Sequence, residues 1–113
     1  EGCRIRPPLA RALETLPQGF PALAKGTDID REEYSLFANK AAASELDAIV
    51  AAHNISRIDV CGLAGDICVR NTLADGSAIY GKERFCVLRS FTASTDGGHA
   101  LNELIESEKL CAV

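Results

Sequence analysis

Short apolar runs alternate with amphipathic stretches along this chain, and the two periods predict strands and helices in turn. The predicted strands are 21–24, 57–63, 84–88 and 110–113. The predicted helices are 8–16, 41–53, 66–80 and 98–107. Continuous apolar strands separated by helices are typical of a parallel sheet with helices on both faces. The pattern therefore predicts an α/β fold, a three-layer α/β/α sandwich with a parallel sheet, right-handed crossovers and Rossmann-like topology.

The polar residues between these elements predict how the chain enters its longest helices. Residues 27–33 are expected to form a loop, after which Tyr34 and Phe37 bring two aromatic rings back to the structure. Ser44 is the expected N-cap within the segment 41–53. The buried side of that helix is expected to carry Leu46, Ile49 and Val50.

Composition indicates one compact domain, residues 1–113, because 47% of the residues are hydrophobic and 25% are charged. The net charge of -4, with both signs interspersed, excludes the basic surface of nucleic-acid-binding and membrane-surface proteins. No apolar run approaches transmembrane length, and the opening residues are not a signal peptide. Because the chain opens on Glu1 without a methionine, we expect it to begin partway into a longer protein and its sandwich to be incomplete.

The cysteines divide into structural and chemical candidates. Their number, five, is odd and includes no C-x-x-C pair, which argues against a disulfide framework or a zinc site and favours a reduced, cytoplasmic setting. Cys61, Cys86 and Cys111 lie in apolar strand runs, so we expect them to pack in the core.

Cys68 has a different context, in the segment CGLAGDIC at 61–68. Here a buried strand is expected to end in a sharp turn that places Cys68 in the first turn of the next helix, where unpaired N–H groups stabilise a thiolate. Lys25 follows the first predicted strand, so both residues fall at the carboxyl edge of the sheet, where α/β proteins bind ligands. Cys68 is therefore a candidate nucleophile with Lys25 beside it. Asp66 is interpreted as the N-cap of the helix or as a polar organiser of the site, with capping favoured.

Three segments, KGTD at 25–28, EYSLF at 33–37 and GLAGDICV at 62–69, resemble the nicotinamidase branch of the isochorismatase-like cysteine hydrolases. Their order, spacing and position at strand ends agree with that family, and the resemblance covers nearly the whole chain. It implies an isochorismatase-like fold. Family members are nearly twice as long, so the chain is similar to the C-terminal half of one.

The resemblance also implies a catalytic triad of Asp, Lys and Cys. Lys25 and Cys68 match two of its members, whereas nothing here matches the aspartate. The resemblance implies that backbone N–H groups of Ala64 and Cys68 would form the oxyanion hole, beside a cis peptide that here would be Leu63–Ala64. The family's divalent metal (zinc, iron or manganese) would have its ligands outside this chain, because no histidine precedes Lys25. We assign no metal ligands here.

The implied activity is an amidase that converts nicotinamide to nicotinic acid and ammonia through a thioester on Cys68, a step of NAD salvage. Tyr34 and Leu63 are expected to hold the pyridine ring between them, with Phe37 behind. Core packing is the alternative for Tyr34 and Phe37. The expected partner is a small-molecule amide, with no nucleic acid and no membrane, and a homo-oligomer is compatible with the sequence.

Two other functions remain open. The same residues would serve another isochorismatase-like hydrolase, acting on isochorismate or on ureido, carbamoyl or maleamate substrates. Because the triad aspartate and the metal ligands have no match, the chain could instead be a truncated, non-catalytic α/β module that needs its other half. In either case we expect these 113 residues to be inactive alone.

Overall fold

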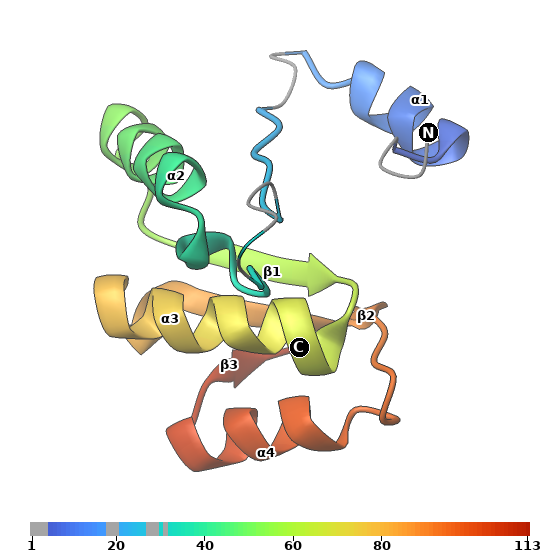
Figure 1. Ribbon diagram of the computed structural model, residues 1–113, viewed down its shortest axis with the longest axis vertical. Helices are drawn as coiled ribbons and strands as arrows, with labels where there is room; N and C mark the ends of the chain where they lie inside the picture. The colour runs from blue at the N-terminus through green and yellow to red at the C-terminus, as the bar shows by residue number, and fades with distance from the viewer. Residues whose placement is uncertain (1–4, 18–20, 27–29, 31) are drawn as a thin grey trace.

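A three-stranded parallel sheet lies at the centre of the computed structural model, which describes residues 5–17, 21–26, 30 and 32–113. Its strands are β1 (Ile58–Gly62), β2 (Phe85–Thr92) and β3 (Cys111–Ala112), in the order β1-β2-β3 (Figure 1). Both strand pairs are parallel. The predicted α/β class and parallel sheet are therefore confirmed.

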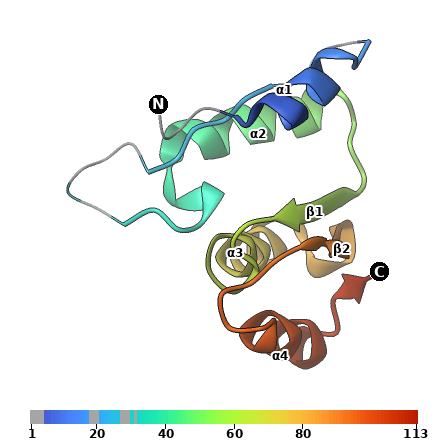
Figure 2. The same cartoon turned by 90° about the vertical axis from the view of Figure 1, so that its right-hand side faces the viewer.

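Four α-helices accompany the sheet in the described residues: α1 (Pro7–Glu14), α2 (Lys40–Ala52), α3 (Arg70–Tyr80) and α4 (His99–Glu108). Three short helical segments, η1 (Leu36–Ala38), η2 (Gly65–Val69) and η3 (Lys82–Arg84), link them. Because successive strands advance in one direction across the sheet, right-handed crossovers place α3 and α4 on the same face (Figure 2). The core between them and the sheet consists of Val69, Leu73, Phe85, Val87, Leu101, Ile105 and Leu110.

The opposite face of the sheet carries side chains that alternate with the core residues. Asp59, Cys61 and Cys111 on that face are exposed, so the layer formed by α3 and α4 covers the other face only. Burial of Cys86 is confirmed, with 1% of its surface exposed, whereas the expected core packing of Cys61 and Cys111 is wrong. The side chains of those two residues point away from α3 and α4.

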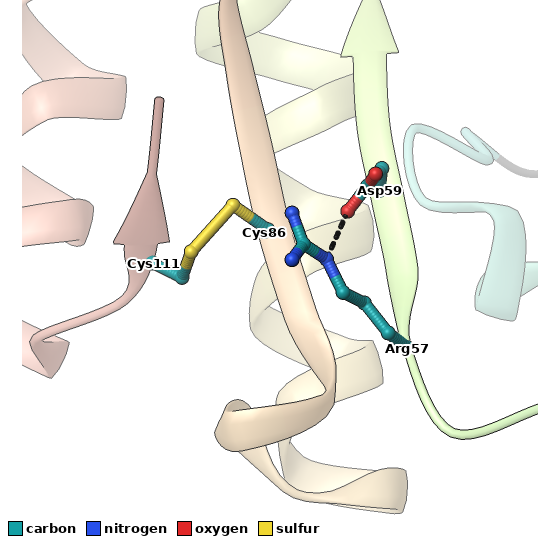
Figure 3. Close-up of polar contacts among 4 residues, drawn as sticks. All are labelled: Arg57, Asp59, Cys86 and Cys111. Atoms are coloured by element: carbon teal, nitrogen blue, oxygen red, sulfur yellow. Dashed lines mark hydrogen bonds and ion pairs between the residues drawn. A yellow bond between two sulfur atoms is a disulfide. The ribbon is translucent and has the colours of Figure 1, made fainter.

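Cys86 and Cys111 form a disulfide across β2 and β3 (Figure 3). The sequence argued against a disulfide framework, and this pair departs from that expectation. The cause is the strand register, which sets Cys86 directly opposite Cys111 with their Cα atoms 4.5 Å apart. Counting cysteines along a sequence does not reveal which ones a parallel sheet brings together.

The N-terminal part of the chain departs most from the predicted elements. Residues 21–24 form no strand: the run is short, and Pro21 has no N–H to donate to a neighbouring strand. The N-cap of α2 is Asn39 rather than Ser44, because the helix begins earlier and Asn39 Oδ1 accepts a hydrogen bond from Ala42 N–H at 3.0 Å. Helix α1 buries no residue and lies apart from the sheet (Figures 1 and 2).

None of the helices in the described ranges is both long and apolar enough to cross a membrane.

Candidate active site around Cys68

The turn between β1 and α3 brings the chain sharply back toward the sheet. It begins at Gly62, whose φ of 118° is in the region that favours glycine, and continues through a cis peptide between Leu63 and Ala64. The carbonyl oxygen of Ala64 then accepts hydrogen bonds from Ile67 N–H at 3.1 Å and Val69 N–H at 3.0 Å. These two hydrogen bonds to one carbonyl shape η2, which contains Cys68. The sequence predicted Cys68 in the first turn of a helix that begins at Asp66, whereas α3 itself begins only at Arg70, after η2.

Gly65 lets this turn pack tightly against the rest of the fold. Its N–H donates to Ala93 O at 2.8 Å, and the residue is buried. A Cβ atom at this position would lie 3.0 Å from Thr92 Cγ2 and 3.3 Å from Leu101 Cδ2, and closer still to Ser94 Oγ. A glycine therefore lets the turn contact the end of β2 and helix α4 at once.

Lys25 and Cys68 meet although 43 positions separate them. Lys25 Nζ lies 3.2 Å from Cys68 Sγ and donates to the carbonyl oxygen of Glu33, also at 3.2 Å. Both Lys25 and Cys68 are partly exposed, so the pair is accessible from solvent. The structure thus brings together the two residues that the sequence singled out for chemistry.

Asp66 ties the turn to the loop that precedes α4. Its carboxylate accepts from Thr95 N–H at 2.9 Å and from the Thr95 hydroxyl. These two hydrogen bonds hold the pKa of Asp66 below its ordinary value. The favoured interpretation of Asp66 as a helix N-cap is wrong, because its side chain makes no cap hydrogen bond to η2. It organises the turn instead.

The three residues expected to hold a substrate ring occupy two environments. Tyr34 and Leu63 have 48% and 77% of their surface exposed. The pKa of Tyr34 is raised, first by a hydrogen bond to Glu32, then by the charge of that carboxylate and by burial, with a further contribution from Cys68 nearby. Phe37 instead faces Tyr80, with ring centroids 6.1 Å apart, in the packing between η1 and α3. Its part in substrate binding stays a prediction.

No cluster of three or more His, Cys, Asp or Glu side chains that could hold a metal ion is found in the described residues. His53 caps the C-terminus of α2, and His99 pairs with Glu103 at 3.1 Å on an exposed face. The described residues therefore offer no set of ligands that fits the divalent metal implied by the resemblance.

Glu33 was not identified from the sequence, although its backbone carbonyl contacts Lys25 and its side chain binds Gly26 and Asn39. The buried carboxylate of Glu33 accepts from Gly26 N–H at 2.7 Å, and its Oε1 also accepts from Asn39 Nδ2 at 3.1 Å. The only sequence signal is an acidic residue directly before a Tyr-Ser pair, which is indistinguishable from an ordinary solvated carboxylate.

Searches with the sequence find no matching family model and no sufficiently similar curated protein. A solved structure, the pyrazinamidase of Pyrococcus horikoshii in complex with zinc, is similar to this chain with a TM-score of 0.66 and 26% sequence identity. The match covers 87% of this chain and 52% of the pyrazinamidase chain, so the chain spans about half the length of that protein. Over that region this chain has the isochorismatase-like α/β fold, with a three-stranded parallel sheet, that it shares with a pyrazinamidase.

Proposed function

We propose that this chain carries the nucleophilic part of an amidase site that converts nicotinamide to nicotinic acid and ammonia. The observation that supports this most directly is the 3.2 Å contact between Lys25 Nζ and Cys68 Sγ at a strand-to-helix turn. The similarity to a pyrazinamidase over most of the chain supports a hydrolase-like fold.

In this proposal the sulfur of Cys68 attacks the carboxamide carbon of the substrate. The C–N bond then breaks, ammonia leaves after taking up a proton, and a thioester remains on the enzyme. Water adds to the thioester, which releases nicotinic acid and returns the thiol. Lys25 would stabilise the thiolate before attack. The proton acceptor of the implied triad, an aspartate, has no match in this sequence.

The turn itself would stabilise the oxyanion that forms on the amide oxygen. Backbone N–H groups of Ala64 and Cys68 are the proposed donors, and removing one such donor typically costs about 2.7–4 kcal/mol of transition-state stabilisation. Tyr34 and Leu63 are exposed side chains close to this turn in space or sequence, and they would contact the two sides of the ring. Phe37 would support them indirectly through its packing on Tyr80.

The test is ammonia release from nicotinamide by the full-length gene product and three single variants. Cys68→Ala should abolish turnover, and Lys25→Ala should lower kcat by orders of magnitude, both with a melting temperature close to that of the unchanged protein. Cys61→Ala is the matched control: this free thiol lies seven positions away and is exposed, and its loss should leave turnover unchanged. Normal turnover by Cys68→Ala would refute the nucleophile assignment.

Substrate choice within the superfamily is decided by the same assay with other amides. The residues at 33–37 favour nicotinamide over ureido, carbamoyl or maleamate substrates, which share the Cys and Lys requirement. If the protein turns over one of these substrates faster than nicotinamide, that substrate takes the place of nicotinamide in the proposal.

A non-catalytic assembly module is the second candidate. It is favoured by the exposed sheet face with Cys61 and Cys111, and by β1, which has no second strand partner in the described residues. A full-length product that turns over none of these amides but forms a stable complex would support this second function.

A further inference from the structure

We infer that Glu33 is a positioning residue that holds the Lys25 ammonium against Cys68. The inference rests on the proposed function, because it assigns Glu33 a role in that same site. The segment that carries Lys25 is not part of the sheet and has no strand partners, so other contacts must fix its position.

Glu33 makes those contacts with two different groups. Its side chain accepts a hydrogen bond from Gly26 N–H at 2.7 Å, which fixes the backbone next to Lys25. Its own carbonyl oxygen accepts from Lys25 Nζ at 3.2 Å, and the same nitrogen lies 3.2 Å from Cys68 Sγ. Glu33 therefore holds both ends of the lysine: the backbone at its base and the ammonium at its tip.

Glu33 is in turn anchored to a rigid element. Its Oε1 also accepts from Asn39 Nδ2 at 3.1 Å, and Asn39 caps α2 through its hydrogen bond with Ala42 N–H at 3.0 Å. Leu36 N–H donates to Thr72 Oγ1 at 3.0 Å, which ties the following residues to α3. Helices α2 and α3 thus fix the segment that carries Glu33 relative to the turn with Cys68.

Burial makes this arrangement specific. Glu33 is 8% exposed, and a carboxylate removed from water is stabilised by hydrogen bonds that replace its hydration. Removing the side chain would leave Gly26 N–H and the Asn39 amide without this acceptor. The base of Lys25 would then be free to move, and a displacement of about 1 Å at a catalytic group is costly.

The test measures alkylation of Cys68 by iodoacetamide as a function of pH, with the modified peptide quantified by mass spectrometry so that the other cysteines do not contribute. Two other groups act on the Cys68 sulfur: Lys25 contacts it, and the Tyr34 hydroxyl is near enough to interact with the charge of Cys68. Neither Lys25 nor Tyr34 is substituted in the Glu33 variants. Glu33→Ala and Lys25→Met should each lower the rate at neutral pH by roughly tenfold, because cysteine reacts as its thiolate.

Two variants separate positioning from general loss of stability. Glu33→Gln keeps an oxygen that can accept both hydrogen bonds, so it should restore nearly the original rate profile. Ser35→Ala removes another buried polar side chain of the same segment, which bonds to Phe37 N–H at 3.0 Å. It should lower the melting temperature without changing alkylation of Cys68.

Each other outcome has a distinct meaning. An unchanged rate in Glu33→Ala with a lowered rate in Lys25→Met overturns the role of Glu33 and leaves the proposed function standing. A loss in Ser35→Ala as large as in Glu33→Ala also overturns it, because the effect is then unspecific. An unchanged rate in Lys25→Met overturns both the role of Glu33 and the Lys25–Cys68 pairing on which the proposed function depends.

Discussion

Replacing Gly76 by alanine tests how rigidly α3 packs on the sheet that positions Cys68. Gly76 is buried in the middle of α3. A Cβ atom there would lie 2.6 Å from Phe85 Cζ, 3.1 Å from Phe85 Cε1 and 3.0 Å from Phe37 Cε2. Two aromatic rings therefore occupy the space that an alanine methyl group needs.

Two opposing effects determine the result. Alanine in a helix interior is more favourable than glycine by about 1 kcal/mol. Overpacking a buried site costs roughly 1–3 kcal/mol. To reach an ordinary carbon–carbon separation of about 3.5–4.0 Å, the Phe85 ring would have to retreat by roughly 1 Å. Phe85 is only 2% exposed and also packs against Tyr80, with ring centroids 6.5 Å apart, so it has little room to do so.

The steric cost should therefore exceed the gain in helix propensity. We expect Gly76→Ala to lower the free energy of unfolding by about 1–2 kcal/mol, from roughly 2–3 kcal/mol of overpacking less about 1 kcal/mol of propensity. For a domain of this size the melting temperature should fall by roughly 3–10 °C. Urea unfolding followed by circular dichroism, with thermal melts, measures both quantities.

The neighbouring residue provides the control. Ser77 Oγ is buried with no hydrogen-bond partner in the described part of the chain, so Ser77→Ala should be neutral or stabilising by about 0.5–1 kcal/mol. Opposite signs at adjacent positions would show that Gly76 is kept for space rather than for flexibility. A Gly76→Ala protein as stable as the original would refute the claim that the two rings cannot move aside.

Three further changes probe the core and the polar contacts. Leu73→Ala removes a side chain with 0% exposure and should cost about 2–5 kcal/mol in urea unfolding. The pKa of Tyr80 is raised by burial and by its hydrogen bond to Asp47, so the phenol stabilises the fold below pH 10.0 and this contribution is lost as the pH rises through the higher pKa of the folded state. Urea midpoints of Tyr80→Phe should therefore lack that alkaline loss. Hydrogen bonds from Thr95 lower the pKa of Asp66, so the carboxylate stabilises the fold above pH 3.8 and this contribution is lost as the pH falls through the lower pKa of the folded state. The melting temperature of Asp66→Asn should therefore depend less on acid pH.

The helices and strands of residues 40–113 could be predicted from the sequence to within a few residues, because their apolar positions repeat with clear periods. The exception is the end of β2, which extends to Thr92. Three of its added residues, Arg89, Ser90 and Phe91, are exposed, so their apolar pattern is weak. The last one, Thr92, pairs with Gly62 of β1 through an irregular register. Pairing between strands depends on tertiary register, which no local pattern contains.

The candidate site could be predicted only in part, for a similar reason. Cys68 was identifiable because it follows a glycine-rich turn at the start of a predicted helix, and Lys25 because it precedes Gly26 in a segment that resembles the hydrolase family. Glu33 was not, because a carboxylate in a polar segment is normally solvated. Its burial arises only when Gly26 and Asn39 converge on it from two directions.

Two free cysteines in the same stretch, Cys61 and Cys68, lie in different surroundings. Cys61 is the more exposed of the two, yet it lies on the sheet face opposite α3 and α4. Cys68 is partly covered, but it lies in a helical turn and its sulfur contacts the Lys25 ammonium. Exposure controls access, whereas a nearby cation and a helix N-terminus control the fraction of thiolate. In the proposed function the chemistry therefore depends on the loop that carries Lys25, and we expect a substitution there to impair Cys68 without altering the turn that carries it.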